Sequence, residues 1–133
     1  MKIYDCFMYF DEEVVLDLRL NTLNEYVDYF IIVESSFNHK GGKRKLKFNH
    51  KRFEKFAKKI IYLVYDKVPQ KIKPINPQDT KDEKSIKYIY NAYLRENSQR
   101  NYIVKGLDHA DQNDIILISD VDEIPNLEKI NFD

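Results

Sequence analysis

The 133-residue sequence has no tryptophan, one cysteine, three glycines and no net charge, because 22 lysines and arginines balance 22 aspartates and glutamates. The lone Cys6 excludes an internal disulfide and a metal site built from several cysteines. Its apolar surroundings indicate a buried, unreactive thiol. The balanced charge gives no sign that the chain captures nucleic acid or an anionic membrane by bulk electrostatic attraction.

Long apolar runs are also missing, and no stretch approaches the roughly 20 residues that a membrane span needs. The first ten residues, MKIYDCFMYF, include Asp5 and no small-residue cleavage site, so they predict a strand and not a signal peptide. We therefore expect one soluble, cytoplasmic domain over residues 1–133. The sequence also lacks a Ser-His-Asp set, a glycine-rich phosphate loop and a His/Cys metal cluster.

Four short apolar segments, rich in β-branched and aromatic residues, have the signature of β-strands. They are Ile3 to Tyr9, Tyr29 to Glu34, Ile60 to Tyr65 and Ile115 to Ser119. Their apolar runs are mostly continuous and do not alternate with polar residues. This pattern is typical of a parallel sheet that is covered on both faces.

Helical patterns lie between these segments, over residues 11–26 and 49–59 and from Thr80 through Leu107. Thr80 and Glu83 have the spacing of a capping box, which predicts the start of the third helix. The alternation of strands and helices predicts a Rossmann-like α/β fold with a mostly parallel sheet and right-handed crossovers.

Acidic residues follow the last predicted strand, in the sequence IILISDVDEIP. Ligands of open α/β sheets bind beyond the carboxyl ends of the strands, where Asp120 and Asp122 are expected. Alternate residues of extended backbone point the same way, so the two carboxylates could together hold Mg²⁺ or Mn²⁺ bridging to a diphosphate. The alternative is an acidic loop that caps a following helix, with Pro125 as an early helical residue.

Other polar residues have two interpretations each. Glu34 ends the second strand at the same edge and is either an acceptor for a nucleoside or a solvated strand end or helix cap. Glu96 and Arg100 lie four apart on a helix face, shared with Ile89 and Tyr93, that we expect to be buried. They form either a structural ion pair or a site with an anion-binding arginine. The basic loop over residues 39–47 either covers substrate phosphates or is a solvated charge run.

Three segments, residues 3–35, 95–107 and 114–125, together resemble glycosyltransferase family 17. The family contains β-1,4-mannosyl-glycoprotein 4-β-N-acetylglucosaminyltransferases. The resemblance implies a GT-A fold, whose N-terminal half is a Rossmann-like sheet. It also implies an inverting transfer from a UDP-sugar, with UDP-N-acetylglucosamine as the expected donor, to a glycan acceptor, and a Mn²⁺ or Mg²⁺ ion held at the D-x-D motif.

The resemblance also implies roles for individual residues. Asp122 matches the direct metal ligand, and Asp120 matches the residue that faces the ribose or a metal-bound water. Glu34 and Ser35 match the strand end near the nucleoside, and Glu96 and Arg100 match the helix before the motif. Glu34, Ser35 and Arg100 are therefore candidate donor contacts. Glu13 and Arg19 match the family's first-helix pattern. No catalytic base is assigned, because the acceptor half of a GT-A enzyme would supply it.

The sequence stops shortly after the motif, and we expect the chain to be the N-terminal part of the enzyme, truncated at its C-terminus. An open sheet edge could then pair with a second copy as a homo-oligomer. A non-catalytic nucleotide-sugar-binding module or an inactive fragment is the main alternative. A phosphatase-like hydrolase would place its D-x-D motif after the first strand, and a purely structural α/β domain would bind no UDP.

Overall fold

A computed structural model describes residues 1–132 as four parallel strands with the order β3-β2-β1-β4. The strands are β1 (Ile3–Tyr9), β2 (Tyr29–Ser35), β3 (Ile60–Tyr65) and β4 (Ile115–Ile118); the helices are α1 (Glu13–Leu23) and α2 (Lys81–Asn101), with short 3₁₀ turns η1 (Glu54–Phe56), η2 (Tyr102–Gly106) and η3 (Leu127–Lys129). The predicted parallel α/β sheet is confirmed, and every strand lies within one residue of its expected ends.

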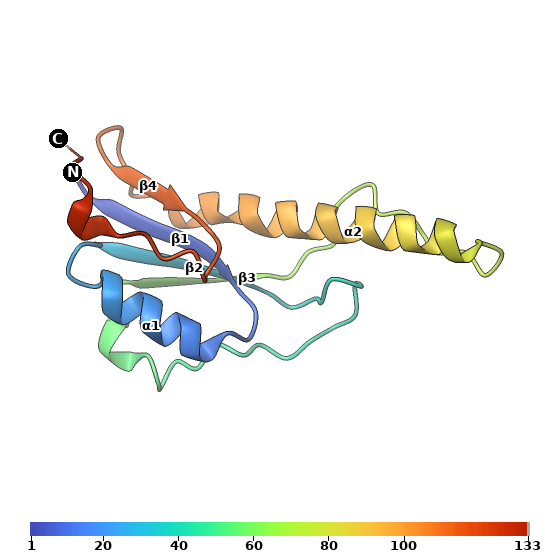
Figure 1. The fold of residues 1–133 in the computed structure, drawn as a ribbon, viewed down its shortest axis with the longest axis horizontal. Coiled ribbons are helices and arrows are strands. Elements are labelled where there is room, and N and C mark those ends of the chain that lie inside the picture. Colours follow the sequence, from blue (N-terminus) through green and yellow to red (C-terminus); the bar gives the residue numbers. More distant parts are fainter. Residues whose placement is uncertain (133) are drawn as a thin grey trace.

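The sheet is covered on both faces, with α1 on one and the end of α2 with η2 on the other (Figure 1). Alternate strand residues enter the two cores, because successive side chains point to opposite faces. Phe7 and Phe30 pack against α1, whereas Cys6 and Ile31 face η2. Burial raises the pKa of the fully buried Cys6 thiol to about 12, which agrees with the unreactive thiol predicted from the sequence.

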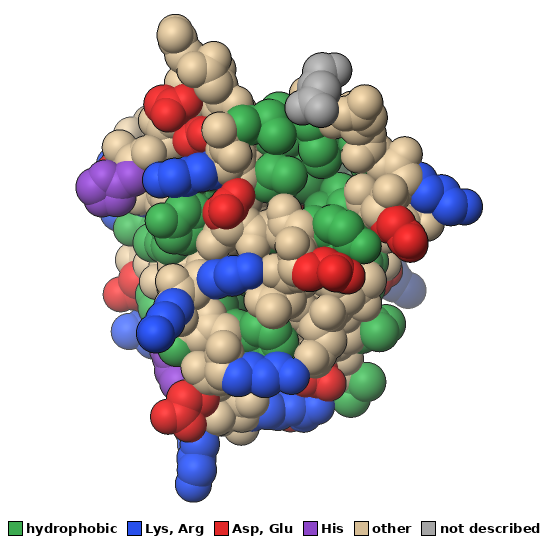
Figure 2. All heavy atoms as spheres, turned by 90° about the vertical axis from the view of Figure 1, so that its left-hand side faces the viewer, with side chains coloured by type: hydrophobic (Ala, Val, Ile, Leu, Met, Phe, Trp, Pro, Cys, Tyr) green, Lys and Arg blue, Asp and Glu red, His purple; other side chains and the backbone are tan. Residues whose placement is uncertain are grey.

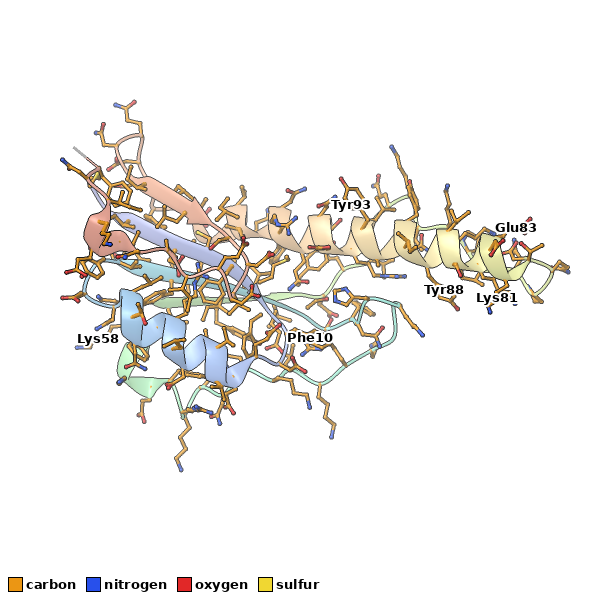
Figure 3. All side chains as sticks on the ribbon, viewed as in Figure 1. Phe10, Lys58, Lys81, Glu83, Tyr88 and Tyr93 are labelled. Atoms are coloured by element: carbon orange, nitrogen blue, oxygen red, sulfur yellow. The ribbon has the colours of Figure 1, made fainter. Side chains whose placement is uncertain are left out.

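Helix α2 contacts the sheet only near its C-terminal end and extends well past the carboxyl ends of the strands (Figure 1). Its start is the predicted capping box, in which Thr80 and Glu83 each accept the other's backbone N–H at 3.1 Å. The expected burial of the Ile89 and Tyr93 face is wrong, since these side chains are 72% and 62% exposed. Tyr93 lies on the outer side of the helix (Figure 3), where the sheet does not reach.

The helix expected over residues 49–59 is also wrong, because only η1 forms a helical turn there. Three buried rings, Phe48, Phe53 and Phe56, fasten this segment to the sheet; Phe48 stacks on Phe53 with ring centroids 5.7 Å apart. Phe48 lies just before the expected helix, and Phe53 and Phe56 enter the α1-side core from the short turn that contains η1. One such turn is enough to bury both rings, and the segment does not continue as an α-helix.

The two ends of the sheet differ in character. Figure 2 views the end that carries the strand N-termini, where cationic and anionic side chains are interspersed. The opposite end carries the strand C-termini, the loops that follow them and the projecting part of α2. Across residues 1–132, neither helix has the length and apolar character required to cross a membrane.

Candidate functional site

A cleft of about 390 Å³ opens at the carboxyl ends of β1 and β4, between the loops that follow these strands and α2. It is lined by residues of β1, the loop before α1, α1, the loop after β2, α2 and the turn after β4: Met8, Tyr9, Phe10, Glu12, Val15, His39, Glu96, Gln99, Asp120, Val121 and Asp122. Both predicted metal-binding aspartates therefore lie in one cleft at the predicted edge of the sheet.

The two aspartates belong to a tight turn over residues 120–123. Glu123 N–H donates to the Asp120 carbonyl at 2.9 Å, and Asp120 N–H donates to Glu123 Oε1 at 2.8 Å. Val121 between them is 6% exposed and packs into the α1-side core, while the Asp120 side chain is 58% exposed. The turn thus buries its apolar residue and presents the carboxylates on either side of it.

Negative charge is concentrated at this turn. Partial burial, followed by the charges of Glu123 and Asp122, raises the pKa of the Asp120 carboxyl above its usual range. The Arg100 guanidinium lies 3.8 Å from the Asp120 carboxylate and acts in the opposite direction. Like charges held close together disfavour ionisation, so a bound cation would stabilise the ionised carboxylates of this turn.

Arg100 and Glu96 form the predicted contact between consecutive turns of α2, with Arg100 Nη2 donating to Glu96 Oε1 at 3.0 Å. The pair is partly exposed, at 35% for the Arg100 side chain and 45% for Glu96, so it is no buried structural pair. Glu96 lines the cleft and Arg100 approaches Asp120. The helix therefore brings both of these predicted residues to the site.

Glu34 lies behind the cleft and not in it. Its fully buried carboxylate accepts hydrogen bonds from Arg44 Nη1 at 2.9 Å, Tyr62 Oη at 2.7 Å and the backbone N–H groups of Lys47 and Phe48 at 2.6 and 3.1 Å. The neighbouring Ser35 Oγ accepts the Phe37 N–H at 3.1 Å. The structure does not bring these two residues to the aspartates, and their contact with a nucleoside stays a prediction.

An aromatic pair at the cleft was not anticipated from the sequence. The rings of Phe10 and His39 stack with centroids 5.8 Å apart, and the Arg44 guanidinium lies 4.3 Å from the centre of the Phe10 ring. Phe10 extends from the end of β1 at this edge (Figure 3). The basic loop over residues 39–47 thus contributes a ring to the cleft, and its Arg44 is directed inward to Glu34.

Arg19 of α1 matches the family's first-helix pattern, but its buried contacts were not anticipated from the sequence. Its side chain is fully buried, and its guanidinium binds the Asp5 carboxylate through Nε at 2.8 Å and Nη2 at 2.6 Å. The remaining N–H groups donate to the residues 119–123. The available signal was the position of Arg19 on the same helix face as Leu16, Leu20 and Leu23, where an arginine requires a buried partner.

The donor set fits a divalent ion only in part. Within residues 1–132, no three His, Cys, Asp or Glu side chains are grouped so that they could hold a metal ion by themselves. Mg²⁺ and ions like it are commonly held by one or two carboxylates, with substrate phosphates and water completing the coordination. The carboxylates of Asp120 and Asp122 beside an open cleft match that kind of site.

Comparison with known proteins gives a consistent result. The sequence model of glycosyltransferase family 17 matches residues 1–132. Over 122 residues, 89% of this chain, the sequence is 30% identical to the beta-1,4-mannosyl-glycoprotein 4-beta-N-acetylglucosaminyltransferases of Homo sapiens, Rattus norvegicus and Mus musculus. The matched part is 20 to 21% of these proteins, so the chain spans about a fifth of their length. No solved structure matches.

Proposed function

Because the chain belongs to glycosyltransferase family 17, we propose that its cleft binds a UDP-sugar, with UDP-N-acetylglucosamine as the first candidate, for transfer to a glycan acceptor. The observation that carries this proposal is the position of Asp120 and Asp122 in an open cleft at the carboxyl edge of a parallel sheet. This edge is where α/β sheets bind nucleotides. We also propose, from the family membership, that the sheet is the nucleotide-binding half of a GT-A fold.

Asp122 is the proposed direct ligand of Mn²⁺ or Mg²⁺, and Asp120 holds the ion or one of its water ligands. The ion, when bound, neutralises charge on the diphosphate leaving group. Arg100 would contribute a second positive charge, since its guanidinium already lies 3.8 Å from Asp120. It can turn from Glu96 to a phosphate oxygen without losing a charged partner.

In the proposed transfer, the acceptor hydroxyl oxygen forms a bond to the anomeric carbon while the bond from that carbon to the diphosphate oxygen breaks. UDP leaves with the bonding electrons, and the hydroxyl proton passes to a base. We assign no residue of this chain to that base. Binding of the nucleotide-sugar without transfer is the second candidate, since the cleft residues to which we give roles serve the donor and its metal ion.

Calorimetric titration of UDP tests the proposal. We expect binding in the presence of Mn²⁺, little binding with a chelator, and loss of the Mn²⁺-dependent part in Asp122→Ala. Asp108→Ala is the matched control, because Asp108 is an exposed aspartate outside the cleft. Equal UDP binding with and without Mn²⁺, or by Asp122→Ala and the unaltered chain, would contradict the proposed metal site.

Hydrolysis and transfer of labelled UDP-N-acetylglucosamine then distinguish the two candidates. Release of UDP that depends on a glycan acceptor supports a transferase. Metal-dependent binding with no release of UDP in the presence of mannose-containing N-glycans supports the binding module.

A further inference from the structure

The guanidinium of Arg19 donates hydrogen bonds to the backbone of the turn that carries the two aspartates. Nη1 donates to the carbonyl oxygens of Asp120, Val121 and Glu123 at 2.7, 3.2 and 3.1 Å, and Nη2 donates to Ser119 Oγ at 2.6 Å. Together with the two bonds to Asp5, these contacts occupy all five N–H donors of the side chain. An arginine about one hundred residues earlier in the chain therefore contacts most of the residues of this turn.

The contacts are directed at the turn and are not general features of a buried ion pair. Three carbonyl groups point inward to one nitrogen, and Val121 is buried beside them. The Asp120 side chain is consequently directed outward, to the cleft. The Arg19 guanidinium also lies 4.6 Å from the centre of the Phe7 ring, which fixes it from the sheet side.

The positive charge of Arg19 is neutralised by Asp5, so it does not repel a cation bound at the turn. Asp5 on β1 is fully buried and binds the guanidinium through both carboxylate oxygens. The pair is therefore close to neutral, and it can hold the turn without repelling a divalent ion on the other side of the backbone. A lone positive charge at this position would oppose the cation.

We propose that Arg19 is a positioning residue, which holds the turn over residues 119–123 so that the Asp120 and Asp122 carboxylates share one cation bound to a nucleoside diphosphate. This role rests on the proposed function of the cleft. It requires the planar fork of five donors, because a lysine has three donors on a single atom and cannot bind Asp5 and the carbonyl groups in the same arrangement. Groups that orient metal ligands commonly change metal affinity by about 10- to 100-fold when they are replaced.

The test compares Arg19→Lys with Lys59→Met. Lys59 Nζ also binds backbone carbonyl groups, those of Asn24 and Val27, but at the opposite end of the sheet. UDP affinity in saturating Mn²⁺ is measured by calorimetry at a temperature where each variant is fully folded. We expect Arg19→Lys to weaken Mn²⁺-dependent UDP binding by about 10-fold or more, and Lys59→Met to leave it within twofold of the unaltered chain's value.

Amide hydrogen exchange gives the second readout, in the absence of any ligand. We expect exchange at Glu123 N–H, which donates to the Asp120 carbonyl, to accelerate in Arg19→Lys by more than exchange of the central amides of β1 does. Equal UDP affinity in Arg19→Lys and the unaltered chain, or uniform acceleration of exchange across the sheet, overturns the positioning role. Failure of the unaltered chain to bind UDP overturns the proposed function, and the positioning role with it.

Discussion

Two buried arginine–carboxylate pairs lie on the same face of adjacent strands, and they hold different parts of the molecule in place. In the Asp5–Arg19 pair, the arginine extends past its partner and collects carbonyl oxygens of the turn after β4. In the Glu34–Arg44 pair, the carboxylate also accepts from two backbone N–H groups and Tyr62 Oη, and Arg44 donates to the carbonyl oxygens of Ser35 and Phe10 at 2.6 and 2.5 Å. The first pair thus contacts the turn that carries the candidate ligands, whereas the second contacts the loop behind the cleft and Phe10 at its wall.

The difference shows that the role of a buried ion pair depends on the hydrogen bonds that its members make to other residues. Both pairs are buried, with side-chain exposures of 0% for Asp5, Arg19 and Glu34 and 8% for Arg44. Burial alone would give them the same structural role. We therefore expect loss of the first pair to affect both stability and binding, and loss of the second to affect mainly stability.

The largest effect is expected for Arg19→Met, which leaves the Asp5 carboxylate buried without its partner. Removal of one member of a buried pair typically lowers the free energy of unfolding by about 3–5 kcal/mol. Urea denaturation followed by circular dichroism measures it. The double variant Asp5→Leu/Arg19→Met should recover much of the stability, because apolar replacement of a whole pair is often neutral, but it should not recover UDP binding. Recovery of both properties would contradict the distinction between the pairs.

A smaller effect is expected for Glu34→Gln. The amide keeps the size of the side chain but loses the charge. Its NH₂ group cannot accept the hydrogen bonds that one carboxylate oxygen of Glu34 accepts, so some of these donors lose their acceptor. We expect the free energy of unfolding to fall by about 1–3 kcal/mol, and trypsin to cut faster within residues 40–47. UDP affinity should change less than in Arg19→Lys. If the binding free energy of UDP falls by more than the free energy of unfolding, Glu34 contacts the donor.

Tyr62→Phe removes one donor from Glu34 and should lower the free energy of unfolding by about 0.5–1.5 kcal/mol at neutral pH. Burial, then the hydrogen bond to Glu34, raise the pKa of Tyr62 in the folded protein. The corresponding stability is fully present below the unfolded-state pKa near 10 and is lost as pH rises through the folded-state pKa. Thermal unfolding between pH 9 and 11 should therefore depend less steeply on pH in Tyr62→Phe. An unchanged slope would contradict the shift.

Asp114→Asn should have the smallest effect, because this aspartate lies at the amino end of β4, far from both pairs. The Asp111 N–H, then the Lys2 N–H, hydrogen-bond its carboxylate and lower its pKa. Its stabilisation is present above the unfolded-state pKa near 3.9 and is lost as pH falls through the lower folded-state value. Acid unfolding of Asp114→Asn should be less steep below pH 4, with UDP binding unchanged at neutral pH.

The strands were predictable because their continuous apolar runs, with polar loops on either side, allow a parallel sheet and little else. The position of Asp120 and Asp122 followed from the rule for ligand edges. The absence of an α-helix over residues 49–59 was not predictable from the charges and phenylalanines of this segment, since the packing of Phe53 and Phe56 into the α1-side core overrides local helix preference. The exposure of Ile89 and Tyr93 was also hidden, because periodicity reveals a shared helix face and not what covers it.

The buried residues of the site were the hardest to assign. Arg19 was visible only as part of a helix pattern, although its place among Leu16, Leu20 and Leu23 required a buried acceptor. Asp5 is that acceptor because the fold packs α1 on β1, which the sequence alone does not reveal. Contacts between residues one hundred positions apart come from topology, and a single sequence contains no direct signal for them.

Paramagnetic broadening by Mn²⁺ tests the central claim most directly. In amide NMR spectra of the isotopically labelled chain with UDP, small amounts of Mn²⁺ should first broaden the resonances of residues 119–123 and of Phe10. Asp108 and the residues at the amino ends of the strands should stay sharp. Broadening that begins elsewhere, or that is the same with and without UDP and in Asp122→Ala, would contradict a nucleotide-linked metal site in this cleft.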